Sequence, residues 1–269
     1  MASTTVTRAP APKAASPRSN RKVPFPIELY RSAVGKKYVM AVTGIMLMGF
    51  VLFHMVGNLK MYLGIEDINH YGEFLREILV PFLPRTVFLW IMRTGLIAAF
   101  VLHVHAAYAL TRMNSRSREM KYQSKRDYIA ANFASRTMRW SGVIVFLFLA
   151  WHLADLTWGI APFAVDEWTR GDIYGNVAQS LDRIPVAALY IVANLALGVH
   201  LFHGAWSLFQ SLGWNNPRFN RWRRNFAAVF AAIIVVGNVS FPIMTLAGVI
   251  EWDPNVPTVH EIEAQEAGE

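Results

Sequence analysis

Long apolar stretches, separated by short polar and charged segments, dominate this sequence. Five of them are long enough to cross about 30 Å of hydrocarbon as helices, which takes about 20 residues each. They cover residues 38–62, 86–110, 140–162, 185–212 and 226–250. Charged residues, proline or tryptophan bound each stretch. The pattern predicts an all-α, polytopic membrane protein built as a five-transmembrane-helix bundle.

The two ends of the chain differ in composition from the apolar middle. Residues 1–25 are rich in Ala, Pro, Ser, Thr and basic residues. They lack an apolar core, which is typical of a disordered tail and not of a cleaved signal peptide. Residues 251–269 are acidic. We therefore expect a five-helix membrane anchor domain over residues 26–250 between a basic and an acidic tail, with no internal repeat.

Basic residues gather on one side of the predicted bundle. Of the 26 Lys and Arg, 20 lie before residue 38, in 112–139 or in 214–224. Five crossings place these three segments on the same side, and the positive-inside rule assigns that side to the cytoplasm. We expect a multi-pass protein of the bacterial cytoplasmic (inner) membrane, with the N-terminus in the cytoplasm and the C-terminus outside.

Charge and cysteine content narrow the chemistry. The chain has a net charge of +8, and most of its basic residues lie next to the predicted spans. This position indicates contact with anionic lipid and not with nucleic acid. The chain has no cysteine, which excludes disulfides, thiolate metal sites and iron–sulfur ligation by its own residues. A redox centre held by this chain must therefore use histidine.

Histidines are concentrated inside the predicted spans, where an ionisable side chain is costly and usually functional. Four of them come one per span on the first four spans, 49, 49 and 48 residues apart. Low-spin haem b needs two neutral imidazoles on opposite sides of one iron. The spans hold His54, His103, His105, His152, His200 and His203.

Depth in the membrane sorts these histidines into pairs. At 1.5 Å per residue, His54 and His152 lie about 20 to 25 Å from the cytoplasmic edge and His103 about 13 Å from it. The sequence thus predicts an outer haem on His54 and His152. It also predicts an inner haem held by His103 and by a histidine of the fourth span. The even spacing of the histidines favours His200 as this second ligand, whereas depth alone slightly favours His203.

Other polar residues are candidates for propionate, quinone or proton chemistry. Arg93, in the outer third of the second span, suits a haem propionate or a lipid phosphate. His105 points about 200° away from His103 on a helix, so the two cannot face one haem. Quinone and proton candidates are Glu73, Glu77 and Asp155 on the outer side and His203 and Trp206 on the inner side. The sequence leaves both sides open.

Short motifs surround the spaced histidines. They are Ser32-x-x-Gly35-Lys36-Lys37, Met40-Ala41-x-Thr43-Gly44, His54-x-x-Gly57-Asn58-Leu59, Leu110-Thr111 with Asn114, His152-Leu153, His200-x-x-x-Gly204 and Gln210-Ser211-Leu212-Gly213. In combination they resemble the cytochrome b558 membrane-anchor subunits of succinate dehydrogenase and fumarate reductase, respiratory complex II.

The resemblance implies an anchor that binds one or two b haems and exchanges electrons with a quinone, expected to be menaquinone. It also implies that the flavoprotein and iron–sulfur subunits dock on the cytoplasmic face. Two-haem members place one ligand on each of the first four spans, and the His-x-x-x-Gly motif selects His200 over His203. Some fumarate reductases carry a glutamate two residues before the fourth ligand, where this chain has Gly198.

We therefore expect the membrane-anchor cytochrome b subunit of a succinate:quinone oxidoreductase, which passes electrons through haem b to a membrane quinone. The direction of catalysis, the quinone and its side of the membrane stay open. One alternative is a haem-free or single-haem anchor of the same complex. Another is a haem-free transporter or assembly scaffold that uses the histidines as a proton relay.

Overall fold

The computed structural model describes residues 24–117, 133–214 and 216–253, and within these ranges it contains helices and turns but no strand. Most of both predicted tails lies outside the described residues. Five helices are long and apolar enough to cross a membrane, which confirms the predicted all-α polytopic bundle. They are α2 (Ala33–Asn58), α4 (Val87–Arg116), α5 (Phe133–His152), α7 (Ile184–Ser211) and α8 (Asn220–Leu246).

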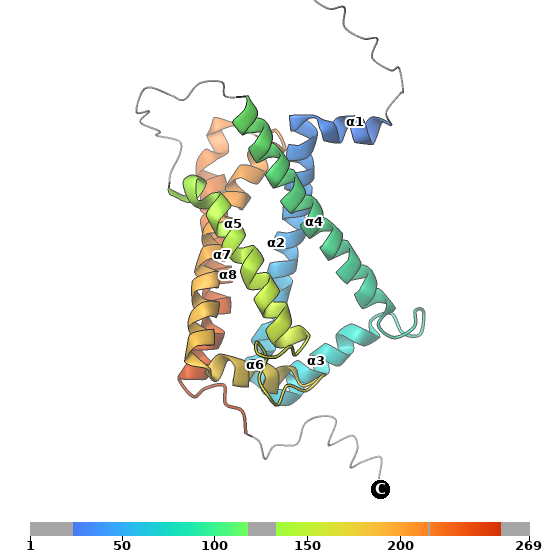
Figure 1. Cartoon of the computed structure of the whole chain (residues 1–269), viewed down its shortest axis with the longest axis vertical. Coiled ribbons are helices and arrows are strands. Elements are labelled where there is room, and N and C mark those ends of the chain that lie inside the picture. The colour runs from blue at the N-terminus through green and yellow to red at the C-terminus, as the bar shows by residue number, and fades with distance from the viewer. Residues whose placement is uncertain (1–23, 118–132, 215, 254–269) are drawn as a thin grey trace, which may run out of the picture.

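Shorter helices lie across the two ends of the bundle. Helix α1 (Phe25–Arg31) lies across the end where α2 begins, which we call the α1 end (Figure 1). Helices α3 (Ile65–Glu77) and α6 (Ile173–Asp182) lie across the opposite end, which we call the α3–α6 end. Three single turns complete the described structure: η1 (Leu59–Leu63), the π-helical η2 (Leu153–Thr157) and η3 (Pro217–Phe219).

Local signals explain two of the helix boundaries. The Ser32 hydroxyl caps α2 by accepting from the Gly35 amide at 2.9 Å. A Cβ on Gly35 would collide with the Leu29 carbonyl, so only glycine permits this sharp turn from α1 into α2. The third long helix, α5 continued by the π-helical turn η2, stops at Thr157, short of the predicted residue 162. Gly159 follows in the left-handed region at φ 62°, where a helix cannot continue.

The outer surface of the bundle is apolar. Only 6% of the most hydrophobic window of α4 is buried inside the protein, against 39% for α7. A surface of this kind suits lipid, where the helices satisfy their own backbone hydrogen bonds. Helix α7 is the centre of the packing and lies against α8, α5 and α2. Fully buried alanines such as Ala187, Ala205 and Ala227 let these backbones approach closely.

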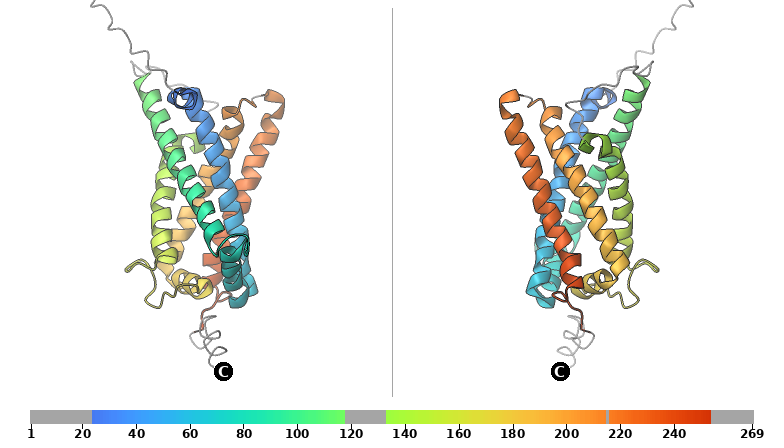
Figure 2. Two further views of the ribbon diagram at one scale, coloured as in Figure 1. Left: turned by 90° about the vertical axis from the view of Figure 1, so that its right-hand side faces the viewer. Right: turned by 90° about the vertical axis from the view of Figure 1, so that its left-hand side faces the viewer.

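The order of elements occurs twice along the chain. Residues 33–116 form a long helix, a single turn, a short transverse helix and a returning long helix: α2, η1, α3 and α4. Residues 133–211 repeat this order as α5, η2, α6 and α7, and α8 follows. Within each half the two long helices pack on each other, and α3 meets α6. Figure 2 shows the long helices running between the same two ends. The expected absence of an internal repeat is therefore wrong at the level of structure.

Candidate cofactor site

The structure brings His54 on α2 beside His152 on α5, in the last turns of both helices. Their ring centres are 5.9 Å apart and their planes are at 83°. Each ring also packs on a phenylalanine one turn earlier, Phe50 or Phe148. Two imidazoles that bind one metal ion from opposite sides through bonds of about 2 Å have ring centres about 6 Å apart. The spacing of this pair therefore suits two histidines that would hold one iron between them.

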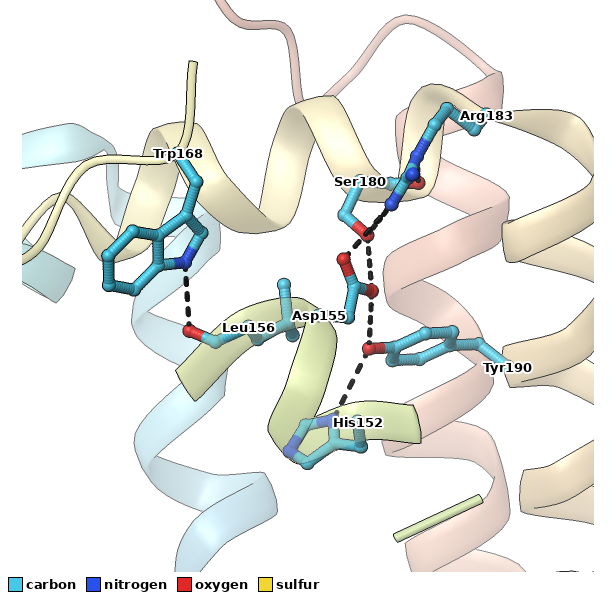
Figure 3. A network of polar contacts seen from close by, with 7 residues as sticks. All are labelled: His152, Asp155, Leu156, Trp168, Ser180, Arg183 and Tyr190. Carbon is cyan, nitrogen blue, oxygen red and sulfur yellow. Dashed lines mark hydrogen bonds and ion pairs between the residues drawn. The ribbon is translucent and has the colours of Figure 1, made fainter. Parts of the chain in front are cut away.

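A buried polar network supports His152 from behind (Figure 3). The Tyr190 hydroxyl lies 3.3 Å from His152 Nδ1 and donates to Asp155 at 3.0 Å. The same carboxylate accepts from Ser180 at 2.6 Å and from Arg183 at 3.0 Å. Asp155 is 1% exposed. Asp155, a predicted quinone or proton candidate, is thus fully enclosed, with partners on α6 and at the start of α7.

The other two spaced histidines, His103 on α4 and His200 on α7, each face a hydroxyl. Thr43 Oγ1 lies 3.2 Å from His103 Nδ1, and Ser141 Oγ lies 3.4 Å from His200 Nδ1. Both hydroxyls donate their own hydrogen to a carbonyl of their own helix. They can only accept from the rings, so each Nδ1 carries the proton and each Nε2 keeps the lone pair that binds a metal.

Glycine lets both of these rings lie directly on a helix backbone. A Cβ on Gly44 would come 3.4 Å from Cε1 of His103, and a Cβ on Gly142 would come 3.4 Å from Cε1 of His200. Methyl groups at these positions would just touch the rings, and larger side chains would displace them. The sequence pattern alone does not say which ring each glycine faces.

The two halves supply these residues at matching positions. His103 recurs 97 residues later as His200, and a [Ser/Thr]-Gly-x9-His motif recurs after 98 residues. The residues Met40, Thr43, Gly44, Phe50 and His54 recur as Met138, Ser141, Gly142, Phe148 and His152. The repeat accounts for the nearly equal separations of His54 from His152 and of His103 from His200, 98 and 97 residues. Each half thus contributes one histidine to each pair.

The arrangement of the histidines also bears on whether they could bind a bare metal ion. Among the described residues, no group of three or more His, Asp or Glu side chains is placed to hold a metal ion. None of the four histidines belongs to the buried class of residues. Histidines whose Nδ1 faces a hydroxyl and whose Nε2 keeps its lone pair, as at His103 and His200, are suited to hold haem iron.

Comparison with known proteins agrees with this geometry. Residues 111–239, just under half of the chain, match the family model of the succinate dehydrogenase/fumarate reductase transmembrane subunit. The match supports the predicted membrane-anchor subunit of complex II. It spans the end of α4 through most of α8 and includes one histidine of each pair, His152 and His200. The cytochrome b558 type stays a prediction. No curated protein and no solved structure matches the chain.

The predicted proton candidates Glu73 and Glu77 form ion pairs at the α3–α6 end. Glu73 binds both Arg76 and Arg85, and Glu77 lies 3.5 Å from Arg85. Burial lowers the pKa of Arg76 below its usual value, and repulsion from Arg85 and Arg93 lowers it further. The two glutamates therefore balance a concentration of positive charge and share no hydrogen bond with the network around Asp155 among the described contacts.

The remaining residues predicted to serve propionate, quinone or proton chemistry lie on α4 and α7. His203 Nδ1 and Trp206 Nε1 are buried and have no hydrogen-bond partner within the described part of the chain. Such groups fit a polar ligand, since a buried donor without a partner is costly. Arg93 lies over the ring of a tryptophan at 5.2 Å. His105 hydrogen-bonds Tyr30 of α1 at 2.5 Å and so has a role in holding α1 against α4.

Proposed function

We propose that this chain is the membrane-anchor cytochrome b subunit of a succinate:quinone oxidoreductase and binds two b haems. His54 and His152 would ligate one, and His103 and His200 the other. Haem supplies one-electron transfer between an iron–sulfur subunit and a quinone. The observation that carries the proposal is that His54 and His152, one from each half of the repeated structure, lie with their ring centres 5.9 Å apart.

The hydrogen bonds of the rings favour haem over a proton relay. A relay passes protons in at one ring nitrogen and out at the other, so neither nitrogen is committed. Here the hydroxyls of Thr43 and Ser141 hold the proton on Nδ1 of His103 and His200. Fixing one nitrogen in this way is how proteins orient a histidine whose other nitrogen binds metal.

The charge distribution supports the predicted orientation. Lys36 and Lys37 near the start of α2 and Arg112 and Arg116 near the end of α4 all lie toward the α1 end. By the positive-inside rule this end faces the cytoplasm of a bacterium. The flavoprotein and iron–sulfur subunits would dock there. The pair His103 and His200 would then be the inner one and would receive electrons first.

For the quinone we favour the inner side, near His203 and Trp206. Both rings present a buried nitrogen without a partner among the described residues, and a quinone carbonyl accepts hydrogen bonds from such groups. Replacing Trp206 by Phe keeps an aromatic ring and removes the N–H. We expect a higher KM for quinone with unchanged haem content. An unchanged KM would leave the outer side as the quinone site.

Purification of the complex tests the assignment as a whole. The tagged chain, solubilised from native membranes, is expected to bring down a flavoprotein and an iron–sulfur protein. The pyridine haemochrome assay should give two b haems per chain, and the complex should reduce quinone with succinate. One haem would establish the single-haem alternative. A preparation with neither chromophore nor flavoprotein would support the transporter or scaffold.

A further inference from the structure

The polar network beside His152 interrupts the similarity of the two halves. Asp155 lies at the position that Gly57 occupies in the first half, and Tyr190 lies at the position of Arg93. The first half therefore lacks both the tyrosine that contacts the histidine and the carboxylate that binds the tyrosine. A buried ionic network present beside His152 and absent beside the corresponding His54 points to a role specific to His152.

The backbone of α5 is adapted to place Asp155 in this network. Directly after His152 the α-helix changes to a π-helical turn, Leu153–Thr157. Asp155 lies in this turn and is buried, as is Ala154. Segments of π-helix are uncommon and occur frequently at functional sites, since they cost backbone energy that something else must offset.

Each hydrogen bond in the network is donated toward the Asp155 carboxylate. Arg183 and Ser180 donate to Asp155, and Tyr190 gives its only hydrogen to the same carboxylate. The Tyr190 oxygen then has only lone pairs left for His152, 3.3 Å away. It must accept from His152 Nδ1–H, which leaves Nε2 free (Figure 3).

The charge of the carboxylate strengthens this hydrogen bond. A tyrosine that donates to a carboxylate becomes a better acceptor itself, because linked hydrogen bonds polarise one another at low dielectric. The effect makes the histidine a more electron-donating ligand, as carboxylates do behind metal-bound histidines. The ion pair with Arg183 compensates the negative charge of the buried Asp155 carboxylate.

We propose that Tyr190 and Asp155 are positioning residues for the outer haem: they hold His152 with its proton on Nδ1 and lower the midpoint potential of the iron that His152 would bind. The inference rests on the proposed function. It gives Asp155 a role through Tyr190 and His152 in place of proton delivery to quinone.

Redox titration of the purified complex, followed at the α-band of the b haems, tests this role. Tyr190→Phe keeps the aromatic ring in contact with Phe148 and removes the acceptor. The potential of one haem should shift to more positive values while the other stays unchanged, with two haems still bound. Asp155→Asn should shift the same haem in the same direction. Ser180→Ala, which leaves the contact between Tyr190 and His152 intact, should shift it less.

The outcomes separate the two proposals. Wild-type complex without b haem would overturn the proposed function. Two haems in the wild type and unshifted potentials in Tyr190→Phe would overturn only the present inference, as would equal shifts of both haems. If Asp155→Asn fails to assemble because Arg183 is left unpaired, Tyr190→Phe alone decides. Selective loss of the outer haem from Tyr190→Phe, with the inner haem retained, would support the positioning role.

Discussion

The two histidine pairs lie in unlike surroundings, although the halves that supply them share one order of elements. At the inner pair both rings meet the same kind of group, a hydroxyl from Thr43 or Ser141. At the outer pair His152 alone has an ionic network, whereas His54 Nε2 has a long 3.4 Å contact with Asn58. The repeat thus determines where the four histidines lie, and departures from it determine how each pair is surrounded.

The largest expected effect comes from filling the space in which an inner ring lies. A leucine at Gly44 would project from α2 into His103, so we expect loss of the inner haem with the outer haem retained. Haemochrome stoichiometry should fall from two to one per chain. Gly49→Leu is the matched control on the same helix, because a Cβ there meets no atom within 4 Å. Equal haem loss in both variants would mean that α2 merely tolerates no leucine.

A smaller effect is expected from removing the inner hydroxyls. Thr43→Val and Ser141→Ala leave an Nδ1–H without its hydroxyl acceptor, and a buried donor without a partner costs about 1–3 kcal/mol. The backbone of Met40 also hydrogen-bonds His103, which limits the change. We expect a shift in the potential of the inner haem only, measured by redox titration. Thr43→Ser should restore the wild-type value, and a shift confined to the outer haem would reverse the assignment of the pairs.

The smallest effect is expected beside His54. Asn58→Ala removes a contact that is long for a hydrogen bond, at 3.4 Å. Both haems should stay bound with unchanged potentials in the same titration that detects Tyr190→Phe. A shift as large as that of Tyr190→Phe would show that the two outer histidines are supported equally, and the contrast between the halves would lose its meaning.

The parts of this fold that lipid dictates could be predicted from the sequence. A bilayer of fixed thickness requires about 20 apolar residues per helix, so the long helices follow from hydropathy. The transverse helices α3 and α6 could not be found this way, because short amphipathic segments between spans look like loops. The repeat was also missed, since only scattered residues such as Gly44 and Gly142 are kept between dissimilar apolar neighbours.

In the candidate site, the histidines could be predicted from the sequence and their hydrogen-bond partners could not. The cost of burying a histidine at membrane depth, together with the even spacing, singled out the four candidate ligands. Their hydrogen-bond partners Thr43, Ser141 and Tyr190 depend on the rotation of one helix against another. Hydroxyl residues are common in membrane helices, and nothing in a single sequence says which of them will face a histidine on another helix.

The pairing of histidines across the two halves is tested most directly by haem stoichiometry in double variants of the purified complex. The single variants His54→Leu and His152→Leu should each lose one haem, and so should the double variant, because both residues hold the same iron. Combining His54→Leu with His103→Leu should lose both haems. If the double variant of His54 and His152 lost both haems while that of His54 and His103 lost only one, the pairing would be contradicted.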